Sequence, residues 1–221
     1  MNGLEILNMK IIYDFGANNG LNLNYFLKKA DKVVAIEANP NLVEKIKNSF
    51  SKEIEDGRLF IEQCVASNSF GKVNFYVNKI HDVLSTMILP EEEVENYNAI
   101  FIDQKPASEI IKKHGNPFYV KIDIEGADGL ILKDIFSSRI YPEFISAECH
   151  NIDVFCHMVA SGKYSMFNLV DGGSVQNDYG FAYHSSGPFG DDIKGKWLNA
   201  NDFFERLAEN GLGWKDIHAK K

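Results

Sequence analysis

The chain has 221 residues, of which 45% are apolar and 24% charged, an ordinary composition for a globular protein with a sizeable core. Its 23 basic and 31 acidic residues give a formal net charge of -8, which argues against a nucleic-acid partner. No apolar run approaches the roughly 20 residues that span a bilayer, and the N-terminus lacks the features of a signal peptide. We therefore expect a cytoplasmic protein with no membrane partner. The cysteines Cys64, Cys149 and Cys156 lack metal-binding spacing and are expected to be reduced thiols.

Apolar runs alternate with helical spacings along the first sixty residues. Leu23, Phe26 and Leu27 share one face of a predicted helix, and Pro40 suits a first helical turn. The predicted elements are a strand at 11–15, a helix at 21–30, a strand at 33–36, a helix at about 40–50 and a strand at 59–61.

Between residues 66 and 117 the pattern is less regular. Alternation at 73–77 predicts a half-exposed strand, and 78–98 holds few regular signals. The remaining predicted elements are helices at 108–113, 127–137, 152–161 and near 201–210, strands at 119–122 and 144–147, and a closing strand pair at 164–170 and 180–184.

This alternation predicts an α/β fold, with a mostly parallel sheet, helices on both faces and an antiparallel edge. We expect one domain over residues 1–221, with its core at about 10–184. The segments 66–117 and 185–221 are expected to supply substrate-side loops and a tail helix.

Polar residues follow the predicted strands, where parallel α/β sheets bind their ligands. The first loop reads Asp14-x-Gly16-x-x-x-Gly20, and Glu37 ends the second strand. A nicotinamide-binding loop would carry G-x-G-x-x-G, and an acidic residue at its start would repel a pyrophosphate. Asp14 suits an ammonium group, and Glu37 can accept hydrogen bonds from both hydroxyls of a ribose. The pair indicates S-adenosylmethionine, whereas the alternative is an ordinary turn with a solvated glutamate.

Four segments carry a family resemblance: YDFGANNG at 13–20, VVAIEANP at 33–40, YVKIDIEGAD at 119–128 and PEFISAECHN at 142–151. Together they resemble the FkbM-type methyltransferases, with Ala38 standing where that family often has proline. The resemblance covers roughly residues 10–170. It implies a Rossmann-like class I fold with seven strands and S-adenosylmethionine as cofactor. The residues then expected at the cofactor are Asp14, Gly16, Asn18, Gly20, Glu37, Asn39, Cys64, Val65 and Asp123, with Cys64 and Val65 near the adenine.

The resemblance also implies methylation of a hydroxyl on a sugar or another small metabolite. Such an acceptor must lose a proton, so a general base is expected after the fourth or fifth parallel strand. We expect His150, Asp123 and Glu148 to be catalytic, because an imidazole titrates near neutral pH. The alternatives are a structural role for His150 and helix capping by Asp123 or Glu125. No metal is expected, although Asp123, Glu148 and Asn151 offer oxygen ligands that suit magnesium.

The segment 185–192 reads as a loop. Phe189 and Trp197 are candidates for stacking on a sugar, with Asp191 and Asp192 on its hydroxyls; the alternative is a plain surface loop. Two rival functions remain open. One is N-methylation of a small amine or peptide, although no N-P-P-[YF] motif is present. The other is a non-catalytic nucleotide-binding module.

Overall fold

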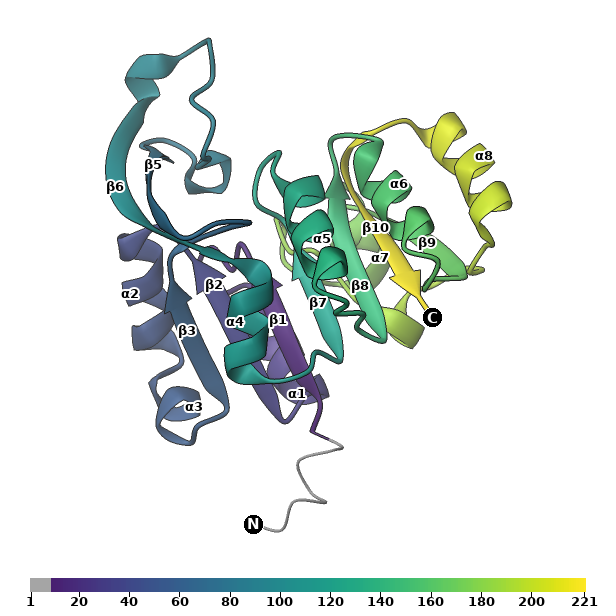
Figure 1. The fold of residues 1–221 in the computed structure, drawn as a ribbon, viewed down its shortest axis with the longest axis horizontal. Helices are drawn as coiled ribbons and strands as arrows, with labels where there is room; N and C mark the ends of the chain where they lie inside the picture. Colours follow the sequence, from purple (N-terminus) through teal and green to yellow (C-terminus); the bar gives the residue numbers. More distant parts are fainter. Residues whose placement is uncertain (1–8) are drawn as a thin grey trace.

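A seven-stranded sheet organises the computed structural model, which describes residues 9–221 (Figure 1). The strand order is β3-β2-β1-β7-β8-β10-β9. The first five strands run parallel, and β10 runs antiparallel between β8 and the edge strand β9. The predicted α/β fold, with its antiparallel edge, is confirmed. The strands are β1 (Ile11–Phe15), β2 (Lys32–Glu37), β3 (Leu59–Gln63), β7 (Tyr119–Ile122), β8 (Phe144–Cys149), β9 (Met166–Asp171) and β10 (Gly213–Lys220).

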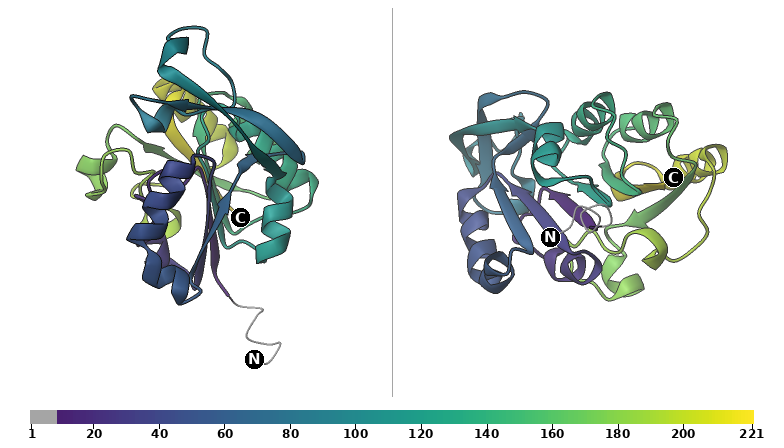
Figure 2. Two further views of the ribbon diagram at one scale, coloured as in Figure 1. Left: turned by 90° about the vertical axis from the view of Figure 1, so that its left-hand side faces the viewer. Right: turned by 60° about the horizontal axis from the view of Figure 1, so that its bottom comes forward.

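Helices cover both faces of this sheet (Figure 2). Alternate residues of β1 face opposite sides: Tyr13 and Phe15 pack with α4, α5, α6 and α8, whereas Ile12 packs with α1 and α2. The predicted helices are all present. The helices are α1 (Leu23–Lys29), α2 (Pro40–Ser49), α3 (Ser51–Glu55), α4 (Ala107–His114), α5 (Asp128–Ser137), α6 (Asp153–Ala160), α7 (Val175–Tyr179) and α8 (Ala200–Asn210). Within residues 9–221, no helix is long and apolar enough to cross a membrane.

The prediction of a strand at 180–184 is wrong. Those residues form a turn in which Gly180 and His184 have positive φ angles, and the antiparallel partner of β9 is β10 from the chain end. Strand β10 lacks an apolar run because Asp216 and His218 are buried within it, between Ile217 and Ala219. The main sheet therefore extends beyond the expected core limit at residue 184.

A second, three-stranded sheet of order β4-β6-β5 forms an arm beyond the carboxyl ends of the main strands (Figure 1). The long strand β6 was not predicted, because only alternate residues such as Ile100 and Ile102 pack inward, against Val73 and Val77. The arm comprises β4 (Val65–Ser67), β5 (Gly71–Asn78) and β6 (Tyr97–Pro106), with the short 3-10 helices η2 (Asp82–Leu84) and η3 (Val94–Asn96) between β5 and β6. A third, η4 (Gly190–Asp192), precedes α8.

Candidate active site

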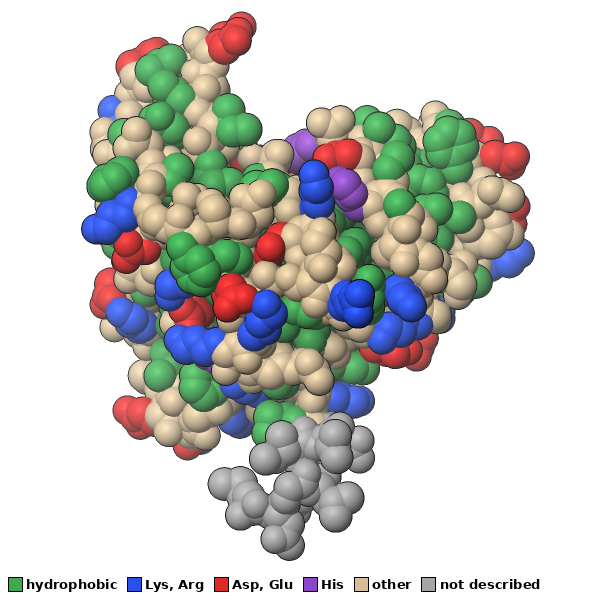
Figure 3. All heavy atoms as spheres, viewed as in Figure 1, with side chains coloured by type: hydrophobic (Ala, Val, Ile, Leu, Met, Phe, Trp, Pro, Cys, Tyr) green, Lys and Arg blue, Asp and Glu red, His purple; other side chains and the backbone are tan. Residues whose placement is uncertain are grey.

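A cavity of about 450 Å³ lies between the arm and the carboxyl ends of the main strands. Figure 3 shows the surface hollowed there, with acidic and histidine side chains on the side opposite the arm. The loops after β1, β2, β3, β7 and β8 all contribute to the lining, as expected for ligand binding in this fold. Of the expected site residues, the cavity is lined by Gly16, Asn18, Glu37, Cys64, Val65, Asp123, Glu148 and His150.

The first loop is built around Gly16. Its φ angle is +83°, and a Cβ there would lie 1.8 Å from the backbone oxygen of Asp123. Only glycine allows this contact between the loops that follow β1 and β7. Gly20 also has a positive φ angle, but the space beside it is filled by Leu23 and Phe50, and it does not line the cavity. Gly20 therefore shapes the turn and does not face the cofactor site.

Glu37 is a buried carboxylate at the cavity wall. Its Oε2 accepts a hydrogen bond from the Asn18 backbone N–H at 2.8 Å, and its Oε1 accepts one from the Asn39 N–H at 2.7 Å. Burial raises the pKa of Glu37 to about 7, although these hydrogen bonds act in the opposite direction. A carboxylate has about four acceptor positions, so about two remain for a ligand. Asn39 caps α2, accepting the Asn41 N–H at 3.0 Å, and does not line the cavity.

Lys121 lies buried between two carboxylates. It is the register neighbour of Asp14 across β1 and β7. Its Nζ is 3.2 Å from Asp14 Oδ1 and 3.2 Å from Asp123 Oδ2, and it donates a hydrogen bond to the Gly16 oxygen at 3.0 Å. Burial lowers the pKa of Lys121, but the surrounding carboxylates outweigh burial and raise it overall. Lys121 was not predicted as a site residue; its signal is a lysine within the apolar strand YVKI.

This arrangement corrects the expectation for Asp14. Its side chain is fully buried and does not line the cavity, so the geometry does not support direct contact with a ligand's ammonium group. Burial raises the pKa of Asp14, and Lys121 acts to lower it. Asp123 is the carboxylate of this pair that reaches the cavity.

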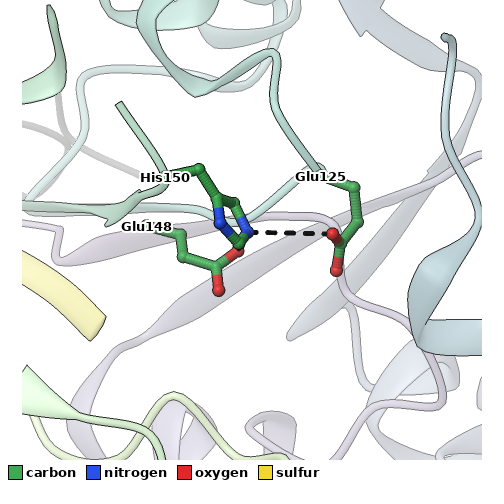
Figure 4. Close-up of side chains that lie close together, drawn as sticks. All are labelled: Glu125, Glu148 and His150. Atoms are coloured by element: carbon green, nitrogen blue, oxygen red, sulfur yellow. Dashed lines mark ion pairs between the residues drawn. The ribbon is translucent and has the colours of Figure 1, made fainter. Parts of the chain in front are cut away.

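Glu125, Glu148 and His150 line the cavity and lie close to one another (Figure 4). His150 Nε2 lies 2.9 Å from Glu148 Oε2 and 3.8 Å from Glu125 Oε2. Burial raises the pKa of Glu148 to about 10, with a further contribution from Asp123. Burial also raises the pKa of Glu125 to about 8, and Asp123 again adds to it.

The sequence offered Glu125 as a possible helix cap, and it was not among the expected catalytic residues. Its φ angle of 50° places it in the left-handed region, and its side chain reaches the cavity. The capping alternative is wrong for both Asp123 and Glu125, because the N-cap of α5 is Ala127 and no side chain caps it. Asn151 does not line the cavity, so the ligand set considered for magnesium is not assembled.

Aromatic rings form the wall opposite the arm. Tyr183 and Trp214 meet edge to face at 5.3 Å, and His184 lies 5.4 Å from Trp214. Trp214 rests on Gly172, where a Cβ would come within 2.4 Å of the indole nitrogen. The facing wall consists of arm residues, including Leu84 and Met87. His184 also lines the cavity.

Phe189 and Trp197, the aromatic residues expected to stack on a sugar, do not line the cavity. Phe189 is buried and stacks on Tyr119 at 4.0 Å, and Trp197 packs beside Ile193. Asp192 Oδ2 pairs with Lys29 at 2.5 Å. The 185–192 loop is therefore held against the sheet and α1. The aromatic residues that line the cavity instead include Tyr183, Trp214 and, from the arm, Phe75.

Comparison with known proteins gives the family. Residues 14–161 match the methyltransferase FkbM domain. The chain belongs to this family. It is therefore a methyltransferase, and the family implies S-adenosylmethionine as its methyl donor. No curated protein sequence matches the chain.

Solved structures resemble the chain only at the level of the fold. The C-terminal domain of precorrin-6Y C5,15-methyltransferase from Rhodobacter capsulatus is 12% identical with a TM-score of 0.46, covering 96% of this chain and 81% of that one. The enzyme of that name from Geobacter metallireducens GS-15 is 12% identical with a TM-score of 0.41, covering 99% and 84%. The StiE O-MT fragment is 11% identical with a TM-score of 0.45, covering 99% and 70%.

Proposed function

We propose that this FkbM-family protein transfers a methyl group from S-adenosylmethionine to a hydroxyl of an uncharged small molecule, such as a sugar. The observation that carries the proposal is a single cavity with two unlike halves. One half presents Gly16 and Glu37, and the other presents Glu125, Glu148 and His150. Donor and acceptor would thus meet in one chamber, which is what methyl transfer requires.

The residues of the first half fit the cofactor. Glu37 has about two acceptor positions left for the ribose hydroxyls, and the absence of a side chain at Gly16 leaves the loop backbone accessible. Asp123, held by Lys121, is the carboxylate proposed to meet the ammonium group in place of Asp14. Cys64 and Val65 remain the proposed adenine neighbours. When bound, the cofactor supplies a methyl group already activated by its sulfonium charge.

The residues of the second half suit an uncharged hydroxylated acceptor. Among the lining residues drawn from 9–221, Lys121 is the one lysine or arginine, and it already contacts two carboxylates. A phosphate or carboxylate on the acceptor would therefore meet Glu125 and Glu148 without a free cation. Trp214 and Tyr183 offer ring faces on which a sugar can pack.

His150 is proposed to receive the hydroxyl proton. An imidazole has a suitable intrinsic pKa for this step, and Glu148 lies beside it, 2.9 Å from Nε2. Methylation of a small amine is the second candidate function, because the same acidic residues attract a cationic acceptor. His150→Ala should slow methyl transfer by roughly 10²–10⁴-fold with little change in cofactor affinity. Unaltered turnover in that variant would remove His150 from the mechanism.

The proposal is tested by calorimetry with S-adenosylmethionine, followed by transfer assays with a radiolabelled methyl group. The acceptor panel should contain methyl glycosides, the corresponding sugar phosphates and small amines. We expect cofactor binding, and transfer to members of the neutral set. Transfer to amines alone favours the second candidate. Failure of the unmutated protein to bind the cofactor would leave only a non-catalytic module on this fold.

A further inference from the structure

Glu125, Glu148 and His150 are arranged in a way that proton transfer alone does not require. A base assisted by a carboxylate needs one acid at one ring nitrogen and the other nitrogen free for the substrate. Here both carboxylates approach the same nitrogen, Nε2 of His150, at 2.9 Å and 3.8 Å. Three potential ligand atoms, one from each residue, lie within 4.8 Å of one another (Figure 4).

The spacing of these atoms suits a shared metal ion. Imidazole nitrogen and carboxylate oxygen bind first-row divalent metals at about 2.0–2.2 Å, so two such ligands at 90–110° lie about 2.8–3.6 Å apart. The separation of 2.9 Å falls within this range, and 3.8 Å is slightly beyond it. Glu125 lies in the loop after β7, Glu148 lies near the end of β8 and His150 directly follows β8, and all three line the cavity.

An independent observation concerns the Glu148 carboxylate itself. The residue is only 4% exposed, and its Oε2 has no hydrogen-bond partner among the described residues. The ring nitrogen of His150 is close to Oε2, but that contact does not have hydrogen-bond geometry. A buried carboxylate oxygen without a donor is costly unless a proton or a cation satisfies it. Lys121, which contacts Asp14 and Asp123, does not supply that cation.

We propose that Glu125, Glu148 and His150 bind one divalent cation at the acceptor end of the cavity. Two carboxylates and one imidazole favour a first-row ion such as Mn²⁺ over Mg²⁺ or Ca²⁺, which prefer oxygen ligands throughout. Three protein ligands leave coordination positions open towards the cavity. The site differs from the oxygen set of Asp123, Glu148 and Asn151 that the sequence offered.

This inference rests on the proposed function in one respect, the placing of the acceptor in this half of the cavity. An acceptor hydroxyl bound to the ion becomes more acidic, so its proton can pass to water without a protein base. Its oxygen then forms the new bond to the methyl carbon while the carbon–sulfur bond breaks, leaving S-adenosylhomocysteine and a methyl ether. With the ion bound, His150 Nε2 is a ligand, so this role replaces proton uptake at that atom.

Binding is measured first, with Mn²⁺ as the probe and without any acceptor. Calorimetry and electron paramagnetic resonance should show one ion per chain, with nitrogen modulation of the spin echo from His150. Glu125→Gln and His150→Asn should each weaken Mn²⁺ binding by at least tenfold, and His150→Asn should abolish the nitrogen signal. Glu109→Gln, at an exposed helical glutamate paired with Lys112, serves as the matched control and should change nothing.

The outcomes separate this inference from the proposed function. S-adenosylmethionine affinity should be unchanged in Glu125→Gln, because that residue lies outside the cofactor half. Absence of Mn²⁺ binding with the cofactor present, or binding that both variants retain, would overturn the cation site while leaving the methyltransferase proposal intact. Once an acceptor is known, loss of transfer with a chelator and recovery with Mn²⁺ would support the site, and full activity in the chelator would refute it.

Discussion

Replacing Glu37 with alanine should weaken S-adenosylmethionine binding by about 10²–10⁴-fold. Two backbone N–H groups, from Asn18 and Asn39, already occupy part of the carboxylate, leaving about two positions for the ribose. Each hydrogen bond to a charged acceptor contributes about 1.5–3 kcal/mol, so two contribute about 3–6 kcal/mol. A tenfold change in affinity corresponds to about 1.4 kcal/mol, which gives the stated range.

The assay is titration calorimetry at pH 7.5, with circular dichroism to confirm folding. Glu55→Ala, at an exposed glutamate in α3, is the control and should bind normally. Glu37→Gln should not rescue binding, because either amide orientation places an NH₂ group against one of the two backbone N–H donors. A folded Glu37→Ala protein whose dissociation constant changed less than about threefold would refute this assignment of the ribose site.

Three further predictions follow from the same region. Since burial raises the pKa of Glu37 to about 7 and the ionised form is the better ribose acceptor, the dissociation constant of S-adenosylmethionine should rise as the pH falls from 8 to 6, by at most about tenfold per unit. In Glu37→Gln, calorimetry should show a dissociation constant that depends less on pH; an equal pH dependence would assign the effect to another group. Gly16→Ala should cost at least about 3 kcal/mol in urea unfolding, because its Cβ would strike the Asp123 backbone oxygen. Gly57→Ala, with φ +70° but open space around it, should cost only about 1–2 kcal/mol, and equal losses would contradict the steric argument. Lys121→Met should destabilise the protein by about 3–5 kcal/mol, measured in the same way, because it leaves buried Asp14 unpaired. Adding Asp14→Asn should recover part of that loss, and no recovery would argue against the pair.

The sequence alone located those site residues whose positions depend on short local segments. Gly16 and Glu37 follow apolar strands directly, so their place at the carboxyl edge of the sheet could be predicted from local patterns. The contact between Asp14 and Lys121 could not, because it depends on the register of β1 against β7, more than 100 residues away. The Asp14 carboxylate was therefore assigned to the ligand when its partner is a lysine.

Other parts of the site depend on backbone geometry that residue types indicate only weakly. Glu125 reaches the cavity through a left-handed conformation that is uncommon for glutamate. Trp214 reaches it because β10 inserts between β8 and β9, and β10 lacks the apolar run that would have predicted a strand. The aromatic wall was consequently sought in the 185–192 loop.

The arm is a separate sheet that borders the cavity. Leu84 and Met87 line the cavity, yet they lie in the connection between β5 and β6, outside the seven-stranded sheet. Exchanging this connection between relatives would reshape one side of the cavity while leaving Glu37 and the glycine turn in place. Mutagenesis aimed at altering the cavity can therefore begin with residues 83–87, an irregular segment whose side chains line the cavity without belonging to the main sheet.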